Sequence, residues 1–284
     1  MRQWSVWGIV VGLVLMAVGG AAGAQEVGVA RNQVEISLMV RGSITVDELG
    51  DVADYALHAP DKLPASVVQF VRTTIDGWVF EPVRRGGEPV RFRGGMNLLL
   101  VAREVEDGDF LMRLQAASFT AESGDSQAVA TSGLKPPRYP EEAARDGVQG
   151  TVYLILKVGR DGRVLDVIAE QVNLRVQESG KKMAELRKVL ADASIKAARK
   201  WEFAPMTGAD GDAAFQSIRV PVDFNMGEQP SYGGWTAYIP GPRRKADWVD
   251  EELAGDSPEA MTAGTPRRVG KEGLRLLAPP SSKG

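Results

Sequence analysis

The stretch that decides the fold is KWEFAP, residues 200–205, of which GWVFEP at 77–82 is a near copy. The shared Trp-x-Phe-x-Pro pattern falls at one constant offset on Trp78, Phe80 and Pro82 and on Trp201, Phe203 and Pro205. A residue before proline is pushed to extended backbone, where side chains two positions apart face the same way. Both rings of each copy can therefore fill a gap between a helix and a sheet, and we interpret the pattern as a structural motif of the core.

The same order of expected elements surrounds both copies: strand, turn, strand, helix, motif, strand. Period-two alternation and helical stripes of apolar residues define the segments. In the first half they are strands 34–46, 52–57 and 91–101 and a helix at 63–78. In the second half they are strands 150–158, 164–170 and 215–224 and a helix at 183–201, with Asp161-Gly162 as a hairpin turn signal. This order predicts a divergent internal duplication. The expected fold class is α+β, with two domains, each an antiparallel sheet of three or four strands carrying helices on one face.

One feature separates the halves. Residues 103–119 contain a turn signal, Asp107-Gly108, followed by alternating apolar residues, which predicts an added hairpin strand against 96–103. Such a strand would cover a sheet edge in the first half. Our hypothesis is that the first copy is a scaffold or dimerisation module and that the second copy keeps an open edge.

Composition excludes several function classes. The chain has 284 residues, a formal net charge of −3, no cysteine and one histidine, His58. The sequence therefore excludes disulfides, thiol nucleophiles and His-rich metal sites. It also has no excess of basic residues that would indicate binding to nucleic acid. No phosphate loop or nucleophile motif is present. We predict a protein that is not an enzyme and uses no cofactor or metal.

The N-terminus predicts export. Arg2 precedes an uncharged run from Val6 to Ala24 that ends in a Gly/Ala-rich stretch before Gln25. This is typical of a signal peptide at 1–24 and of an exported protein. The alternative is an uncleaved membrane anchor with the remainder of the chain exported. A membrane partner is expected only in that second case.

Residues 136–224 carry a fuller pattern. Its pieces are Tyr139-Pro140, Ala144-Arg145, Gly147, Gly150, Asp161-Gly162, the second Trp-x-Phe-x-Pro motif and the closing Val220-Pro221-Val222-Asp223-Phe224. Together they resemble the TonB C-terminal domain family, and residues 34–101 resemble a degenerate second copy. The resemblance implies an energy-transducer family of Gram-negative bacteria, without catalysis or cofactor, in which the TonB box of an outer-membrane receptor adds as a strand to a sheet edge.

The resemblance also implies where a partner would bind. The expected contacts are the last strand and the helix start: Tyr139, Pro140, Arg145, Ser217, Arg219, Val220, Val222 and Phe224. An alternative for Tyr139 is a helix start whose ring packs on the sheet. The family's long spacer is missing, because about ten residues separate Ala24 from the first expected strand. The resemblance thus covers the receptor-binding end of the family.

These features predict a division into a signal peptide or anchor (1–24), a degenerate TonB-like domain (34–119), a linker (120–135), a TonB C-terminal-like domain (136–226) and a largely disordered tail (227–284). Within the tail, WTAYI at 235–239 is expected to form a short strand on the second sheet. The predicted function is binding of outer-membrane receptors or envelope partners by strand addition in TonB-dependent transport. The alternative is a self-associating periplasmic scaffold, for which a homodimer is expected.

Overall fold

The computed structural model describes residues 34–104, 110–121, 134–206, 213–227, 231–249, 258–269 and 274–278. The predicted signal or anchor segment, 1–24, lies outside these ranges, as does most of the predicted linker. Within the ranges, no helix has the length and apolar character needed to cross a membrane.

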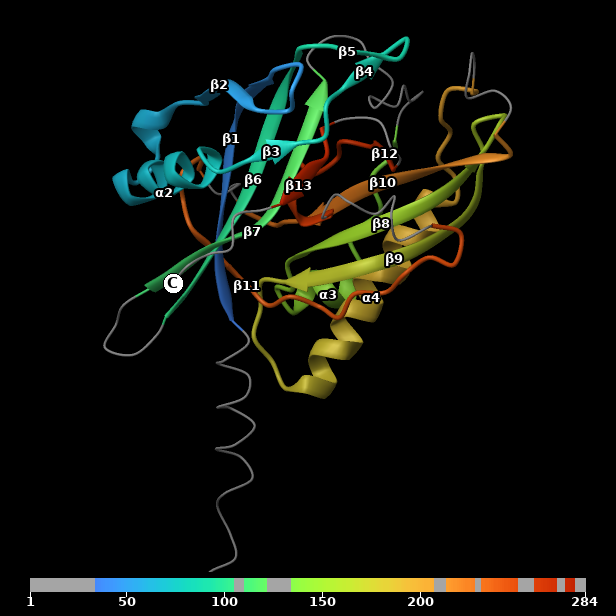
Figure 1. The fold of residues 1–284 in the computed structure, drawn as a ribbon. Coiled ribbons are helices and arrows are strands. Elements are labelled where there is room, and N and C mark those ends of the chain that lie inside the picture. The colour runs from blue at the N-terminus through green and yellow to red at the C-terminus, as the bar shows by residue number, and fades with distance from the viewer. Residues whose placement is uncertain are drawn as a thin grey trace, which may run out of the picture.

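The chain folds as an α+β protein with antiparallel sheets and few helices, as the sequence predicted for the fold class (Figure 1). The first half, residues 34–121, contains β1 (Glu35–Val46), β2 (Val52–Leu57), η1 (Pro60–Lys62), α2 (Ala65–Ile75), β3 (Val79–Phe80), β4 (Arg84–Arg85), β5 (Glu88–Pro89), β6 (Phe92–Glu104) and β7 (Phe110–Ala121). The second half, residues 134–227, contains α3 (Glu141–Arg145), β8 (Gly150–Gly159), β9 (Val164–Leu174), α4 (Gly180–Ala198) and β10 (Phe215–Phe224). The tail supplies β11 (Thr236–Tyr238), η5 (Pro258–Ala260), β12 (Arg267–Val269) and β13 (Leu276–Ala278).

The two main sheets share one strand order. In the first sheet β2 and β6 both pair with β1, and in the second β9 and β10 both pair with β8. A neighbour then follows on the outer side of the last strand, β7 on β6 and β12 on β10. The corresponding strands therefore occupy corresponding places in the two sheets.

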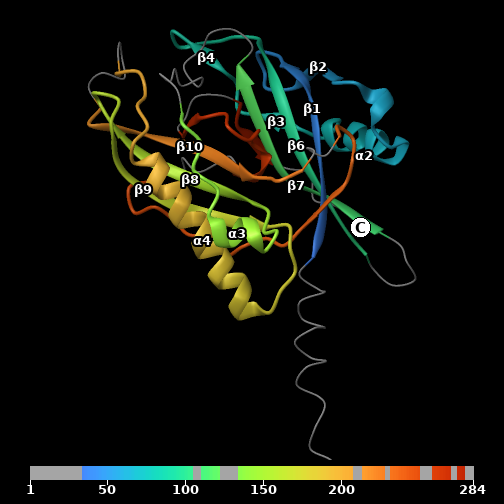
Figure 2. The same cartoon turned by 180° about the vertical axis from the view of Figure 1, so that it is seen from behind.

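Each main sheet has its own core. In the first half Val67, Val71 and Ile75 of α2 pack on inward residues of β1 and β6. In the second half Leu186 and Leu190 of α4 pack on β8, β9 and β10. Figure 2 shows α3 and α4 on one face of the second sheet. The faces away from these helices turn toward each other, and Leu99, Val101 and Ala116 of the first sheet cluster there with tail residues.

The Trp-x-Phe-x-Pro motif has the same backbone contact in both halves. The Phe80 N–H donates to Gly50 O at 2.8 Å, and the Phe203 N–H donates to Gly162 O at 2.9 Å. Both glycines have positive φ, 96° and 83°. A Cβ on Gly50 would lie 2.1 Å from Phe80 O, and one on Gly162 would lie 2.0 Å from Phe203 O. Only glycine fits this hairpin turn, because both the dihedral and the close approach exclude a side chain.

The motif's aromatic side chains are buried in both halves, while Pro82 is half-buried and Pro205 exposed. Trp78 and Phe80 meet edge to face and both contact Phe119 of β7. The Trp201 indole N–H donates to Lys135 O at 2.8 Å. The Trp78 indole N–H, by contrast, has no partner in the part of the chain that the structure describes.

The hairpin strand predicted from residues 103–119 is confirmed as β7. It pairs with β6 from Gly94↔Ala121 to Glu104↔Phe110, with one bulge after Leu99. β6 is therefore covered from Gly94 to Glu104 by its own neighbour in sequence.

The tail differs from the expectation of a largely disordered segment. Its described parts follow the sheets closely, and β11 pairs with β1 of the first sheet, not primarily with the second sheet as expected. Ile239 then forms an isolated bridge with Leu174 of β9. β11 and β12 have three residues each and are too short to be stable alone. They therefore depend on pairing with the sheet edges of the two halves.

Candidate functional site

The candidate site is the outer edge of β10. On its inner side this strand pairs with β8 from Phe215↔Gly159 to Phe224↔Gly150. On its outer side the strand pairing is with β12 alone, from Ser217↔Val269 to Arg219↔Arg267. Figure 1 shows the tail segment that contains β12 between β10 and β7. A strand of ten residues is thus paired on its outer side over three.

Beyond β12 one further backbone contact reaches this edge. The Gly264 N–H donates to Pro221 O at 2.8 Å. Pro221 has no N–H of its own, and proline is confined in sheets to edge positions where a missing donor is tolerated. The residue type at 221 therefore suits a strand whose outer neighbour is not a regular sheet strand.

The predicted contact residues of β10 lie at this edge with their side chains buried. Val220, Val222 and Phe224 belong to the core beneath the helices, and Ser217 and Arg219 lie on the opposite face. A partner strand would reach them through main-chain groups, since little of their side-chain surface is open.

The predicted helix-start residues lie elsewhere. The Tyr139 hydroxyl donates to Val148 O at 2.6 Å, and its ring meets Phe224 edge to face at 5.3 Å. Pro140 directly precedes α3, and Arg145 is exposed in its last turn. Burial raises the pKa of Tyr139 above the ordinary tyrosine value. Both polar and apolar parts of Tyr139 are thus engaged inside the second half, an arrangement that agrees with its alternative role at the helix start.

Arg219 forms a buried ion pair that the sequence did not reveal. Its Nε and Nη2 atoms donate to the two carboxylate oxygens of Glu170 on β9 at 2.8 and 2.9 Å. Only 4% of the Arg219 side chain and 6% of the Glu170 side chain are exposed. Arg243 of the tail adds a second cation to Glu170 at 3.0 Å. The fork geometry spans the sheet and fixes Arg219 away from the outer edge.

Arg267 links β12 to the first half. Its guanidinium donates to Ser118 Oγ and to the main-chain oxygen of Phe119, both on β7. Arg267, Ser118 and Phe119 are all buried. The strand that covers β10 is therefore held by β10 through its backbone and by β7 through this side chain.

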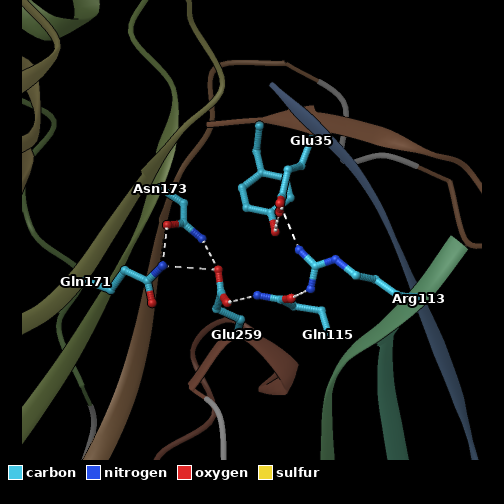
Figure 3. Close-up of polar contacts among 7 residues, drawn as sticks. Glu35, Arg113, Gln115, Gln171, Asn173 and Glu259 are labelled. Carbon is cyan, nitrogen blue, oxygen red and sulfur yellow. Dashed lines mark hydrogen bonds and ion pairs between the residues drawn. The ribbon is translucent and has the colours of Figure 1, made fainter. Parts of the chain in front are cut away.

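A polar network next to β12 holds η5 between the sheets (Figure 3). Glu259 accepts hydrogen bonds from the side-chain amides of Asn173 at 2.5 Å, Gln171 at 3.3 Å and Gln115 at 3.3 Å. Asn173 and Gln171 lie on β9, whereas Gln115 lies on β7. One buried carboxylate of the tail thus joins both sheets.

The network continues to the first strand of the chain. Arg113 contacts Gln115 and forms an ion pair with Glu35 at 2.8 Å, and Glu35 also accepts from the Tyr238 hydroxyl at 2.9 Å. Burial raises the pKa of both Tyr238 and Tyr153, and the nearby Glu259 carboxylate raises both further. Both tyrosines therefore stay neutral to a higher pH than an ordinary tyrosine, and Tyr238 keeps the proton that it donates to Glu35.

The opposite edge of the second sheet, β9, also lies against the tail. Ile239 and Leu174 exchange two backbone hydrogen bonds of 2.7 and 3.1 Å. Farther along, the Arg244 N–H donates to Glu170 O at 2.7 Å. The tail consequently touches both edges of the second sheet.

Within the described ranges, no group of three or more His, Cys, Asp or Glu residues is placed to hold a metal ion. His58 is exposed and stacks edge to face on Tyr232, which anchors the tail to the start of η1. What the site offers is main-chain hydrogen bonding along a strand.

Comparison with known proteins points to the same segment. The family model described as Gram-negative bacterial TonB protein C-terminal matches residues 135–226. These residues belong to the TonB C-terminal domain family. The sequence analysis placed a TonB C-terminal-like domain at 136–226. The first half lies outside the matched residues.

Two relatives of the TonB C-terminal domain are proteins named TonB from Xanthomonas campestris pv. campestris, one from strain B100. Each is 36% identical over 103 residues, which cover 36% of this chain and 40% of the relative. The matched part therefore spans less than half of the length of either relative. No solved structure matches this chain.

Proposed function

We propose that this chain is a TonB-family protein of the Gram-negative cell envelope that binds receptors or other envelope proteins by strand addition at β10, as part of TonB-dependent transport. The observation that carries the proposal is the outer edge of β10, a ten-residue strand whose strand partner β12 has three residues. An incoming peptide that replaces β12 can pair over a longer stretch, and each added pair contributes main-chain hydrogen bonds.

The proposal assigns no reaction to the protein. Strand addition makes and breaks hydrogen bonds only, so it needs neither a general acid nor a cofactor. The buried Arg219–Glu170 pair supports this role structurally, because it stiffens the sheet that would receive the partner.

The first half is proposed to be a degenerate copy of the TonB C-terminal domain that acts as a fixed scaffold. The shared strand order and the matching contacts of Gly50 with Phe80 and of Gly162 with Phe203 support a duplication. Because β7 already covers β6 from Gly94 to Glu104, the strand of the first sheet that corresponds to β10 has no outer edge for a guest strand.

The proposed location is the periplasm, after export by the segment at 1–24. Sequencing the N-terminus of the mature protein from cell envelopes tests this part. We expect it to begin at Gln25, and an intact N-terminus would favour the inner-membrane anchor instead.

A reversible covalent lock tests strand addition. The natural chain has no cysteine, so the double variant Ser217→Cys/Val269→Cys has a single pair of thiols at directly opposite positions of β10 and β12. Opposite residues of antiparallel strands lie within disulfide reach. We expect a synthetic TonB-box peptide to bind the reduced variant and the unmodified chain, and the oxidised variant to lose this binding.

The control is the single variant Val269→Cys, whose binding should not respond to oxidation. Equal peptide affinity in the oxidised and reduced forms of the double variant would refute binding at this edge. Size measurement of the same samples addresses the alternative of a self-associating scaffold, since exchange of β12 between two copies would give a dimer that the oxidised lock prevents.

A further inference from the structure

We propose that the first half selects the guest strand, by requiring an arginine at the position that Arg267 now occupies. This inference rests on the proposed function, since it concerns the strand that would replace β12. The partner chemistry it specifies is an extended peptide segment with an arginine opposite Arg219, as Arg267 is in β12.

The first step concerns the two sides of β12. One side forms backbone hydrogen bonds with β10, and a guest strand of almost any sequence can form such bonds. The other side contacts β7 through the side chain of Arg267, whose guanidinium donates to Ser118 Oγ and Phe119 O. This contact depends on the sequence of the strand. A guest strand on β10 therefore lies against acceptors that belong to the first half.

The second step concerns burial of these acceptors. Ser118 and Phe119 are 2% and 3% exposed, and Arg267 is 6% exposed. A guest with an aliphatic residue at this position would leave the Phe119 oxygen without its charged donor. Loss of one such buried hydrogen bond lowers affinity by about tenfold or more.

The third step concerns charge. Two arginines opposite each other on neighbouring strands normally repel. Here Glu170 binds Arg219 through two hydrogen bonds and directs its charge along the sheet toward β9, so Arg267 is tolerated across from it. A guest with glutamate at this position would instead place a carboxylate against the Ser118 and Phe119 oxygens, and acidic residues are disfavoured there.

The fourth step concerns the source of the guest. The tail of a second copy has the same chemistry as β12 but must compete with the copy already tethered to the site, whose effective concentration is higher. A segment of a different protein that pairs beyond Ser217–Arg219 gains hydrogen bonds that β12 does not make. The guest is therefore expected to come from a partner protein.

The experiment uses the full chain with Arg267→Ala, which weakens the hold of β12 while leaving β10 intact. The probes are a peptide with the sequence of residues 262–269, the same peptide with Arg267→Leu, and a matched control peptide with Arg268→Leu. Isothermal titration should show binding at least tenfold weaker for the Arg267→Leu peptide, and within threefold of the parent for the Arg268→Leu peptide.

A second variant locates the effect in the first half. Adding Ser118→Ala to the chain should weaken the parent peptide about tenfold and leave the affinity of the Arg267→Leu peptide unchanged. If Arg267→Ala does not fold, the same peptides are titrated into the unmodified chain, where competition with β12 weakens all of them but preserves their ratios.

The outcomes separate this inference from the function on which it rests. Equal affinity for the parent and Arg267→Leu peptides, or equally tight binding of a TonB-box peptide without arginine, overturns the arginine requirement and leaves strand addition supported. If no peptide binds although hydrogen exchange shows that β12 has left β10, both proposals fail.

Discussion

The strands β6 and β10 occupy the same place in their sheets but are covered in different ways. β6 is covered by β7, twelve residues long and joined to it as the next strand of a hairpin. β10 is covered by β12, three residues long and contributed by the distant tail. A local hairpin closes with little loss of chain entropy. Pairing of a remote strand costs more chain entropy because its loop is longer, and β12 offsets this cost with fewer hydrogen bonds. The first edge is therefore permanent, and the second is suited to exchange.

The faces that the two sheets turn toward each other differ as well. The first sheet presents Leu99 and Val101, while the second presents the Arg219–Glu170 pair and two of the amides that bind Glu259, those of Gln171 and Asn173. Apolar packing tolerates small shifts, but a buried polar network is stable only when every member is satisfied. The halves share the strand order and the glycine turn of their backbones, and they differ in the side chains on the faces that they turn toward each other.

The largest predicted effect breaks the shared frame. Gly162→Ala should lower the free energy of unfolding by about 3 kcal/mol or more, because the new Cβ combines a left-handed dihedral with a clash against Phe203 O. Urea denaturation measures the change. The matched control is Gly147→Ala, which has a positive φ and no atom within 4 Å of the new Cβ, so about 1 kcal/mol is expected.

The same substitution in the first half sharpens the comparison. Gly50→Ala should match Gly162→Ala, since its Cβ would meet Phe80 O in the same way, and Gly86→Ala is its uncrowded control. A Gly50→Ala variant no less stable than Gly86→Ala would show that the two halves do not depend on one common turn.

A slightly smaller effect is expected from the buried ion pair. Glu170→Gln removes the buried carboxylate that binds the Arg219 guanidinium through two hydrogen bonds, and it should lower the free energy of unfolding by about 3 kcal/mol. Lys188→Gln is the control, because its pair with Asp192 is solvent-exposed and contributes little. Chemical denaturation of both variants compares them directly, and similar stabilities would indicate that the polar face of the second sheet does not need this pair.

The network around η5 gives the next prediction. Glu259→Gln places an amide group against the donors of Gln115, Gln171 and Asn173, and we expect a loss of about 2 kcal/mol in the stability of the tail's attachment. Hydrogen exchange should accelerate in residues 258–269 and stay unchanged in β7. Glu185→Gln on the exposed side of α4 makes the same charge change and should have no effect.

The smallest effect concerns alkaline pH. Because burial raises the folded-state pKa of Tyr238 above its unfolded value, its stabilising contribution is complete below about pH 10 and is lost as the pH rises further. Tyr238→Phe should cost about 1 kcal/mol at neutral pH, through loss of its hydrogen bond to Glu35. Between pH 8 and pH 11 the unfolding temperature should fall less for the variant than for the unmodified chain. An equal fall in both proteins would contradict the assignment.

Much of the regular structure could be predicted from the sequence, because its signals are local. The strand expected at 215–224 is β10 with the same bounds, and the helix expected at 183–201 is α4, shifted by three residues. Alternation and helical stripes report which face of an element is buried, so they work wherever one element is long enough to show a period.

The tail and the buried charges could not be predicted this way. A three-residue strand such as β12 shows no period, and its conformation depends on the edge it meets. In the sequence Arg267 and Glu259 resemble solvated tail residues, and they are buried only because the tail packs against β7 and the second sheet. The one local signal at this edge is Pro221, whose missing N–H marks an outer strand.

The tail's contacts with both β9 and β10 also have a consequence for handling the protein. A fragment ending at residue 226 would lack Ile239, Gly264 and β12, and both borders of its sheet would present unsatisfied backbone groups to solvent. Exposed borders of this kind stack with one another into aggregates. The tail therefore also protects the protein from aggregation. Measurements on a truncated domain would reflect association between exposed sheet edges and not the properties of the full chain.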